Sequence, residues 1–419
     1  MRRTAMDFSK HPCFDSKACK TSARVHLPVA PSCNTQCNYC DRKYDCVQES
    51  RPGVTSVLLK PDQALAYLKR IVSMRKDVSV TGIAGPGDPF ATPDLTMETL
   101  RLVRKEYPEM LLCVASNGIA LAPYADELGR LKVSHATVTV NSMRPETCSK
   151  IYSWVHDGNK TLRGDEVGRY FVSKQSEAVK ALVDAGVTVK INTILIPGVN
   201  EAEVGEVSEC MASLGAKIMN VIPILPVEGT PFGKLQTPSA IKLAAVRAEG
   251  RKSLPQMGHC RRCRADAVGR LDEMPDEPSR EALLESSKIV EKKYVAAATR
   301  EGLYVNLHLG EAEYFAVYRQ EEDAFLLVDT RKAPPPGGGE DRWKELSKTL
   351  SDCRAILASG AGILPTRAME EDGIKVLVME GLLEDGLEVA FGNKEIPCSM
   401  KPMKAGCGAG CAGTGLGCS

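Results

Sequence analysis

Short apolar runs alternate with helical patterns through the first 250 residues of the chain. Apolar runs rich in Val, Ile, Leu or Thr predict strands at 24–29, 79–84, 110–115, 136–141, 187–196 and 218–225. Helical periodicity predicts helices near 61–74, 94–106, 122–130, 174–185, 201–214 and 238–250. Six β–α units in series predict a parallel sheet with right-handed crossovers, which closes into a partial, TIM-like (β/α)6 barrel or a full one. Functional side chains of such folds gather at the carboxyl ends of the strands.

A different pattern follows residue 270. Residues 271–294 are charged, contain two prolines and then become helical, which predicts a linker helix after a barrel domain at 24–270. The range 295–398 predicts a small α/β domain. Its strand patterns lie at 304–308, 314–318 and 324–328, and a Pro/Gly loop at 333–339 precedes a helix near 341–350 and apolar runs at 355–357 and 375–379. Residues 399–419 form a Gly/Cys-rich tail that predicts disorder.

Charge and composition exclude several functional classes. The chain has 419 residues, 54 Lys and Arg against 53 Asp and Glu, and 43% hydrophobic residues. There is no basic stripe, so we expect no nucleic-acid partner. We expect no membrane span either, because no apolar run is long enough. Residues 1–10 lack the apolar core of a secretory signal, which predicts a cytoplasmic location.

Sixteen cysteines indicate metal sites in a long cytoplasmic chain. Cys33, Cys37 and Cys40 follow the first predicted strand, within eight residues. Three thiolates can hold three irons of a cubane and leave the fourth iron open. The amino and carboxylate groups of S-adenosylmethionine can occupy that iron, and electron donation then cleaves a C–S bond to form a radical. The alternatives are a plain electron-transfer cluster or a zinc site with Cys46 as fourth ligand.

Polar or Gly-rich turns follow the later strands and are candidates for binding S-adenosylmethionine. The sequence Gly85-Pro-Gly-Asp88 lets the backbone approach a ligand closely, and Asp88 can accept from its amino group. Asn117 and Asn141 are candidates for ribose and carboxylate contacts, and Ile196 for the adenine side. Each asparagine can equally be a residue that caps a loop.

Further Cys and His residues exceed the needs of one cluster. Cys13, Cys19 and Cys46 flank the first motif, Cys113 lies on the third predicted strand, and Cys260-x2-Cys263 follows the last unit. With His11 and His26 they suffice for two more iron–sulfur clusters. The Cys-x2-Cys pair alone suits zinc equally well, and His26 is a ligand or a hydrogen-bonded core residue. Cys148 and Cys210 are predicted to be core or incidental thiols.

Several of these segments resemble one family. They are His11-Pro-Cys13-Phe, His26-Leu-Pro-Val-Ala-Pro, the run from Cys33 to Asp45-Cys46, Glu49-Ser-Arg-Pro-Gly53, Gly82-Ile-Ala-Gly-Pro-Gly-Asp-Pro89 and Cys260-Arg-Arg-Cys-Arg-Ala-Asp-Ala267. Over about residues 10–270 the chain resembles the NifB family, the radical S-adenosylmethionine proteins of nitrogenase cofactor assembly. Residues 295–395 look like the ribonuclease H-like, NifX-type domain often fused to that family. Where the family has a histidine after Lys-Ala, this chain has Cys19.

The resemblance implies a reaction and its ligands. Two [4Fe–4S] substrate clusters would be fused, with a carbide from S-adenosylmethionine and an extra sulfur, into the [8Fe–9S–C] precursor of the iron–molybdenum cofactor. Cys46, Cys113 and His26 would hold one substrate cluster, and Cys13, Cys260 and Cys263 the other, with His11 in reserve. Cluster-donating assembly proteins, carriers or scaffolds of the NifX and NifEN type, and an electron donor such as ferredoxin would be its partners.

Two other functions are compatible with parts of the pattern. One is a radical enzyme that uses an auxiliary cluster on an organic substrate, which needs only Cys260, Cys263 and one further thiol. It does not account for Cys13 and Cys46 together. The other is a non-catalytic iron–sulfur scaffold or carrier, against which the open iron at Cys33, Cys37 and Cys40 argues. The sequence assigns no role to the cysteines of the C-terminal tail and no source to the extra sulfur.

Overall fold

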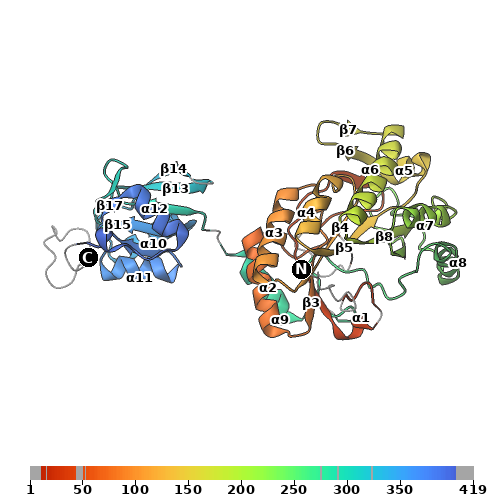
Figure 1. The fold of residues 1–419 in the computed structure, drawn as a ribbon, viewed down its shortest axis with the longest axis horizontal. Helices are drawn as coiled ribbons and strands as arrows, with labels where there is room; N and C mark the ends of the chain where they lie inside the picture. Colours follow the sequence, from red (N-terminus) through yellow and green to blue (C-terminus); the bar gives the residue numbers. More distant parts are fainter. Residues whose placement is uncertain are drawn as a thin grey trace. The chain divides into compact units, whose positions relative to one another are not determined.

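A computed structural model describes residues 11–15, 17–43, 51, 53–273, 276–289, 292–321 and 324–402. The chain forms two compact units that divide after Ile289 (Figure 1). Each has its own sheet and its own apolar core, and each is described by itself. Among the described residues, none of the helices combines the length and the apolar character needed to cross a bilayer.

The first unit is built on a seven-stranded sheet in the order β10-β1-β3-β4-β5-β8-β9. Six strands are parallel and follow chain order: β1 (Ala23–His26), β3 (Val78–Ile83), β4 (Leu111–Ser116), β5 (Val133–Thr139), β8 (Thr188–Leu195) and β9 (Ile218–Pro223). The two-residue strand β10 (Val268–Gly269) pairs antiparallel with β1. The sequence prediction of a partial barrel is therefore confirmed, with an added antiparallel edge.

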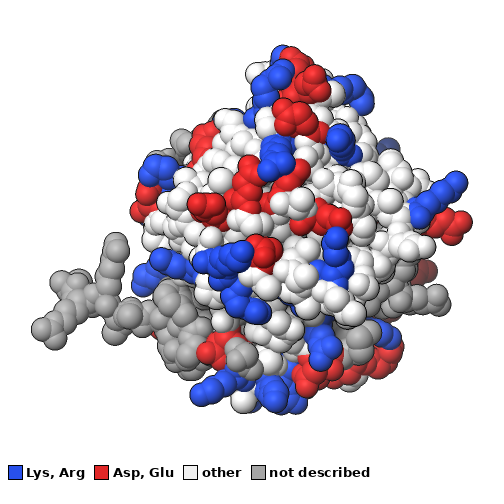
Figure 2. All heavy atoms as spheres, turned by 90° about the vertical axis from the view of Figure 1, so that its right-hand side faces the viewer, with Lys and Arg blue, Asp and Glu red and all other residues white. Residues whose placement is uncertain are grey.

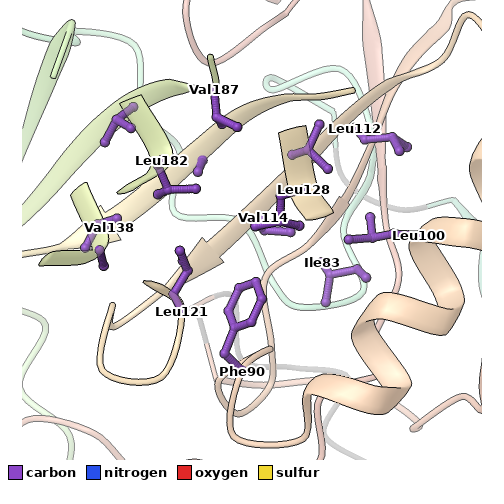
Figure 3. Packing of buried hydrophobic residues seen from close by; sticks show 14 of the residues in the cluster. Ile83, Phe90, Leu100, Leu112, Val114, Leu121, Leu128, Val138, Leu182 and Val187 are labelled. Atoms are coloured by element: carbon purple, nitrogen blue, oxygen red, sulfur yellow. The ribbon is translucent and has the colours of Figure 1, made fainter. Parts of the chain in front are cut away.

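Helices follow the strands and cover one side of this sheet (Figure 1). They are α2 (Pro61–Met74), α3 (Pro93–Glu106), α4 (Ala125–Arg130), α6 (Asp165–Asp184), α7 (Val204–Ser213) and α8 (Ala240–Arg251). Proline at the first position starts α2 and α3, where its missing N–H costs nothing. Apolar side chains such as Leu100 and Leu128 meet Ile83 and Val114 in a dry layer between helices and sheet (Figure 3).

The helix α6 begins at Asp165, well before the predicted start at 174. A glycine inside the helix concealed this turn, because glycine disfavours helices. At Gly168 a Cβ atom would lie only 1.9 Å from the Pro145 carbonyl oxygen, so the glycine lets α5 (Pro145–Ile151) pack closely on α6. The local propensity is therefore overruled by a tertiary contact.

A small antiparallel sheet was not predicted from the sequence. It joins β2 (Thr35–Cys37), β6 (Tyr152–His156) and β7 (Thr161–Leu162). The strands are short and distant in sequence, so no hairpin signal marks the pairing of β2 with β6. The sheet is important for function because β2 contains part of the Cys33–Cys40 motif.

The second unit has a five-stranded mixed sheet in the order β14-β13-β11-β15-β16. Its strands are β11 (Tyr294–Ala297), β13 (Tyr314–Glu321), β14 (Ala324–Lys332), β15 (Cys353–Ala358) and β16 (Lys375–Val378). One face packs on α10 (Glu340–Thr349) and α11 (Ile363–Glu371), and the other on α12 (Leu383–Gly392). The small α/β domain predicted from the sequence is confirmed.

Details of this unit differ from the sequence prediction. The strand expected at 304–308 is interrupted: β12 (Tyr304–Val305) pairs with β17 (Gly381–Leu382), and His308 forms an isolated bridge with Gly360. The strand β11 and the helices α11 and α12 were not predicted. The described residues end at 402, so most of the expected tail lies outside them.

In the first unit, α9 (Glu277–Ser287) packs against α2, where the Gln63 side chain donates to the carbonyls of Ser287 and Ile289.

Candidate active site

A cavity of about 330 Å³ opens in the barrel of the first unit. Each of the six parallel strands contributes to its wall, from His26 on β1 to Asn220 on β9. Predicted site residues on this wall are Cys13, His26, Cys33, Cys37, Cys40, Asp88, Cys113, Asn117, Cys260 and Cys263. Residues up to 250 positions apart in the sequence are thus gathered in one chamber.

The small sheet fixes the loop that contains Cys33, Cys37 and Cys40. The hydroxyl of Thr35 donates to the Trp154 carbonyl at 2.6 Å, and the Asn38 N–H donates to the Ile151 carbonyl at 2.8 Å. A tight turn follows, in which the Cys40 N–H donates to the Cys37 carbonyl at 3.1 Å. All three thiols consequently face the same chamber, as ligation of one cubane requires.

Burial dominates the electrostatics of these thiols. It raises the pKa of Cys33 to about 11 and that of Cys37 well above its usual value, and it also raises the pKa of Cys40. The Arg42 guanidinium opposes this effect at each thiol, and Arg51 also lowers the pKa of Cys40. Metal binding at this motif must therefore release protons, and the two arginines favour the thiolates that a metal needs.

The Gly85–Asp88 loop packs against the cysteine loop. The N–H groups of Gly87 and Asp88 donate to the carbonyls of Ala30 and Ser32, both at 2.8 Å. A Cβ atom on Gly87 would lie 1.9 Å from the Ser32 oxygen, so only glycine fits there. Gly85 has a φ of +146° and precedes a cis proline, and it is not among the residues that line the chamber.

The buried Asp88 carboxylate ties neighbouring loops together. It accepts from the Ser116 hydroxyl at 3.0 Å and from the N–H groups of Asn117 at 2.5 Å and Phe90 at 2.9 Å. Burial raises its pKa, while these three donors lower it. The carboxylate thus fixes the mouth of the chamber in addition to lining it.

The three other predicted contacts differ in their exposure to the chamber. The Asn117 amide lines it and donates to Asn34 at 2.7 Å. Asn141 lies behind the wall, where its amide donates to the hydroxyls of Tyr39 and Tyr152 at 3.0 and 2.9 Å. Ile196 is fully buried in an apolar cluster. Asn141 and Ile196 therefore support the wall from behind.

His26 and Cys113 converge over a glycine deeper in the barrel. His26 on β1 is in register with Gly82 on β3, which is in register with Cys113 on β4. A Cβ atom on Gly82 would lie 2.6 Å from the Cys113 Sγ and 3.4 Å from the His26 Cδ2. The glycine therefore leaves the space in which the two side chains meet.

The tautomer of His26 suits a metal ligand. Its Nδ1 lies 3.0 Å from the Arg264 carbonyl oxygen, which can only accept, so Nδ1 carries the hydrogen and Nε2 keeps its lone pair. Burial lowers the pKa of this imidazole to about 4. His26 is therefore neutral at neutral pH, as ligation requires.

The segment with Cys260 and Cys263 bridges the open side of the barrel. It starts beside β9, where the Met219 N–H donates to Pro255, and ends beside β1, where the His26 N–H donates to Ala267, both at 2.8 Å. The His259 Nε2 lies 2.9 Å from the Pro12 carbonyl and connects this segment to the one with Cys13. Burial raises the pKa of Cys13, and so do Cys263 and Cys260.

Among the described cysteines of the first unit, Cys19, Cys148 and Cys210 do not line this chamber. Cys46 lies outside the described residues. The alternative of a zinc site with Cys46 as fourth ligand therefore falls outside them too. Cys19 is half-buried in α1 (Ala18–Thr21), away from the lining residues. Cys148 is buried in an apolar cluster, as expected for a core thiol. In the part of the chain that the structure describes, no three Cys, His, Asp or Glu side chains converge on a single ion.

Sequence reasoning missed several side chains of the chamber. Lys190, Asn192 and Ile194 alternate along β8 and all line it. Two more side chains lie beside the chamber without lining it: Arg24 donates to the Cys263 Sγ at 3.1 Å, and His135 is in register with Cys113. The sequence contained one signal, because a lysine and an asparagine at alternate positions of an otherwise apolar strand indicate a polar inner face.

Comparison with known proteins identifies similar chains. The profile of the radical SAM superfamily matches residues 27–211, and that of the dinitrogenase iron-molybdenum cofactor family matches residues 291–391. The FeMo cofactor biosynthesis protein NifB of Chlorobaculum tepidum is 45% identical over 99% of both chains. Its counterpart from Klebsiella pneumoniae is 36% identical, over 88% of this chain and 86% of its own.

Solved structures show weaker likeness. A radical SAM methyltransferase from Sphaerobacter thermophilus is 20% identical with a TM-score of 0.39, over 56% of this chain and 64% of its own. SuiB of Streptococcus suis bound to S-adenosylmethionine is 13% identical with a TM-score of 0.41, over 58% and 53%. The family assignment depends on the sequence relatives alone.

Proposed function

The chain belongs to the NifB family of radical SAM enzymes in FeMo cofactor biosynthesis, and we propose that it joins two [4Fe–4S] substrate clusters and inserts a carbon from S-adenosylmethionine and one additional sulfide to give an [8Fe–9S–C] precursor. One observation carries the proposal. The chamber that contains Cys33, Cys37 and Cys40 also contains Cys13, His26, Cys113, Cys260 and Cys263. A radical formed at the first set therefore has a second set of metal ligands within the same cavity.

The first three cysteines would hold the resident [4Fe–4S] cluster, which supplies the electron that cleaves S-adenosylmethionine. Their fit to that group is supported by their common wall and by Arg42, which favours all three thiolates. Asn117 lies at the Cys33 side of the motif, with its amide 3.7 Å from the Cys33 Sγ. We assign to Asn117 and the Asp88 loop the orientation of S-adenosylmethionine at the mouth.

The second set of ligands would hold the substrates. Cys113 and His26, with Cys46, would bind one substrate cluster, and Cys13, Cys260 and Cys263 the other. Their support is the convergence over Gly82 and the bridging segment that carries Cys260 and Cys263. A neutral imidazole is a weaker anchor than a thiolate, and a ligand that leaves readily suits a substrate that must be released.

The proposed chemistry uses two molecules of S-adenosylmethionine. The first transfers its methyl group to a sulfide of a substrate cluster and leaves as S-adenosylhomocysteine. The second is cleaved to methionine and a 5′-deoxyadenosyl radical, which takes one hydrogen atom from that methyl and becomes 5′-deoxyadenosine. The two other hydrogens leave as protons, the carbon–sulfur bond breaks, and electrons from the substrate irons and the external reductant bring the carbon to carbide. A cytoplasmic location, a ferredoxin-type donor, and cluster donors and carriers of the NifX and NifEN type stay predictions.

Product analysis after anaerobic reconstitution tests this function. Three clusters correspond to about twelve irons per chain, and a radical enzyme with one auxiliary cluster to about eight. Incubation with S-adenosylmethionine and a reductant should release both S-adenosylhomocysteine and 5′-deoxyadenosine. An iron–sulfur carrier would release neither, and that result would exclude the catalytic function.

Replacing Cys113 tests whether S-adenosylmethionine binding can be separated from binding of a substrate cluster by the second set of ligands. Cys113→Ala should still bind S-adenosylmethionine, because the thiol lies inside β4 and not in the cysteine loop, but it should form no cofactor precursor. Activation of cofactor-free nitrogenase measures the precursor. Cys210→Ala on α7 removes a thiol outside the chamber and is the matched control. Full activation by Cys113→Ala would disprove the ligand assignment.

A further inference from the structure

A buried lysine faces the chamber from β8. Lys190 is only 6% exposed and lies between Val189 and Ile191, which are fully buried in the core on the outer side of the sheet. Strand alternation therefore turns Lys190 inward, together with Asn192 and Ile194. Its ammonium lies 5.4 Å from the centre of the Phe14 ring, beside the segment with Cys13. Burying a lysine ammonium in such a position destabilises the folded protein unless a negative charge lies nearby.

Lys190 shares the chamber with the candidate substrate ligands Cys13, His26 and Cys113. Phe14, whose ring the ammonium approaches, directly follows Cys13 in the chain. On the neighbouring strand β5, Lys190 is in register with Thr137, two residues beyond the register partner of Cys113. A buried positive charge therefore lies in the part of the chamber that contains these ligands.

The cationic side chains near Cys33, Cys37 and Cys40 differ from those near the substrate ligands. The cations that lower the pKa of Cys33, Cys37 and Cys40 are Arg42 and, for Cys40, Arg51. Both arginines belong to the loop after the motif and line the mouth. Lys190 instead lies deeper, on the strand two places from β4, beyond β5. Lys190 therefore lies on the side of the second set of ligands, where Arg24 also donates to the Cys263 Sγ.

We infer that Lys190 is a positioning residue that retains the anionic substrate clusters and the product formed from them by supplying a fixed, buried positive charge beside their ligands. The inference rests on the proposed function. Loss of protons from the methyl group and addition of a sulfide both make the joined cluster more negative. A buried ammonium next to its ligands stabilises this charge because Coulomb interactions are strong away from water.

Redox titration followed by electron paramagnetic resonance tests this role in the reconstituted full chain. In Lys190→Met the substrate clusters should become harder to reduce, which shifts their midpoints to more negative potentials. Lys190→Arg should restore the parent values, because it keeps the charge. The radical cluster, recognised by the change in its signal on adding S-adenosylmethionine, should keep its midpoint. Lys217→Met, an exposed lysine just before β9, is the matched control.

The outcomes are distinct. Unchanged substrate-cluster midpoints in Lys190→Met would overturn the inference. If Lys190→Met instead loads only about four irons per chain, as for one cluster, recovery of the parent content by Lys190→Arg supports it. Equal loss in both variants overturns it, because charge would then not be the determinant. Failure of the proposed function shows in the parent protein itself, as an iron content for one cluster or as the absence of S-adenosylhomocysteine.

Discussion

Gly82 determines whether the His26 and Cys113 side chains can bind the same substrate cluster. It occupies the register position between them, and its missing side chain leaves the space where they meet. Gly82→Ala would place a Cβ atom 2.6 Å from the Cys113 Sγ, which is far inside contact distance, so the thiol must move. We expect this variant to lose at least half of the substrate-cluster iron while S-adenosylmethionine cleavage continues. Iron analysis and 5′-deoxyadenosine release measure the two effects.

A second glycine supplies the control. Gly205 lies inside α7, where an added Cβ atom would come no closer than 4.0 Å to the Glu249 Cβ, and alanine favours a helix there by about 1 kcal/mol. Gly205→Ala should therefore keep its full iron content. Normal loading of Gly82→Ala would show that Cys113 and His26 do not hold a common cluster.

Buried histidines should make the metal-free protein sensitive to acid. Burial lowers the pKa of His26 to about 4 and that of His135 to about 3, against 6.5 in an unfolded chain. As pH falls below 6.5 the unfolded chain binds protons that the folded chain does not, so the free energy of unfolding decreases. Each histidine contributes up to about 1.4 kcal/mol per pH unit until its folded pKa is reached.

Thermal unfolding of the reduced, metal-free protein between pH 7.5 and 5 checks this effect. The midpoint should fall over that range, where the titration of most carboxyl groups contributes little. His135→Gln should make the decrease shallower, since it removes one of the protonated groups from the unfolded chain. A midpoint that is constant or rises on acidification would contradict the buried, neutral state of these histidines.

Strands, and the motifs that follow them, could be predicted because local pattern determines both. The six parallel strands and most of their helices fall where apolar periodicity placed them, since a sheet packed on helices must bury these positions. The Cys33–Cys40 motif and Asp88 then follow from the rule that parallel sheets bind ligands at their carboxyl ends. The parallel sheet of the first unit and most of its covering helices were therefore predictable without tertiary information.

Features that depend on long-range contacts could not be predicted in this way. The pairing of β2 with β6 joins short segments that have no turn between them. The bridging segment between β9 and β1 is irregular, so its hydrogen bonds to Met219 and His26 left no periodic signal. Lys190 lies within a strand whose burial became clear only with the barrel in place. Sequence resemblance supplied the ligand set, and the structure supplied the Gly82 position.

The chamber and the residues that line it belong to the first of the two compact units. The helix α9 contacts α2 through Gln63, so this unit is complete at Ile289. On the face shown in Figure 2, Lys and Arg are interspersed with Asp and Glu. In this unit, exposed ion pairs such as Arg144 with Glu206 contribute little to stability. The core of the first unit must therefore provide most of its stability.

A chain shortened to residues 1–289 should retain cleavage of S-adenosylmethionine. The second unit has a separate core around Trp343 and Phe315, and the described residues that line the chamber all belong to the first unit. We expect 5′-deoxyadenosine release within about twofold of the full chain, because a change below 0.5 kcal/mol is usual for sites outside a contact network. Loss of release with normal iron content would show that the second unit completes the site.

The central claim is that the radical acts on a methyl group attached to an iron–sulfur substrate inside this chamber. The most direct test uses S-adenosylmethionine with a fully deuterated methyl group and mass spectrometry of the 5′-deoxyadenosine released by the reconstituted chain. The account predicts that one deuterium enters 5′-deoxyadenosine without any added organic substrate, and that Cys113→Ala abolishes this transfer. Release of 5′-deoxyadenosine that contains no deuterium would contradict it.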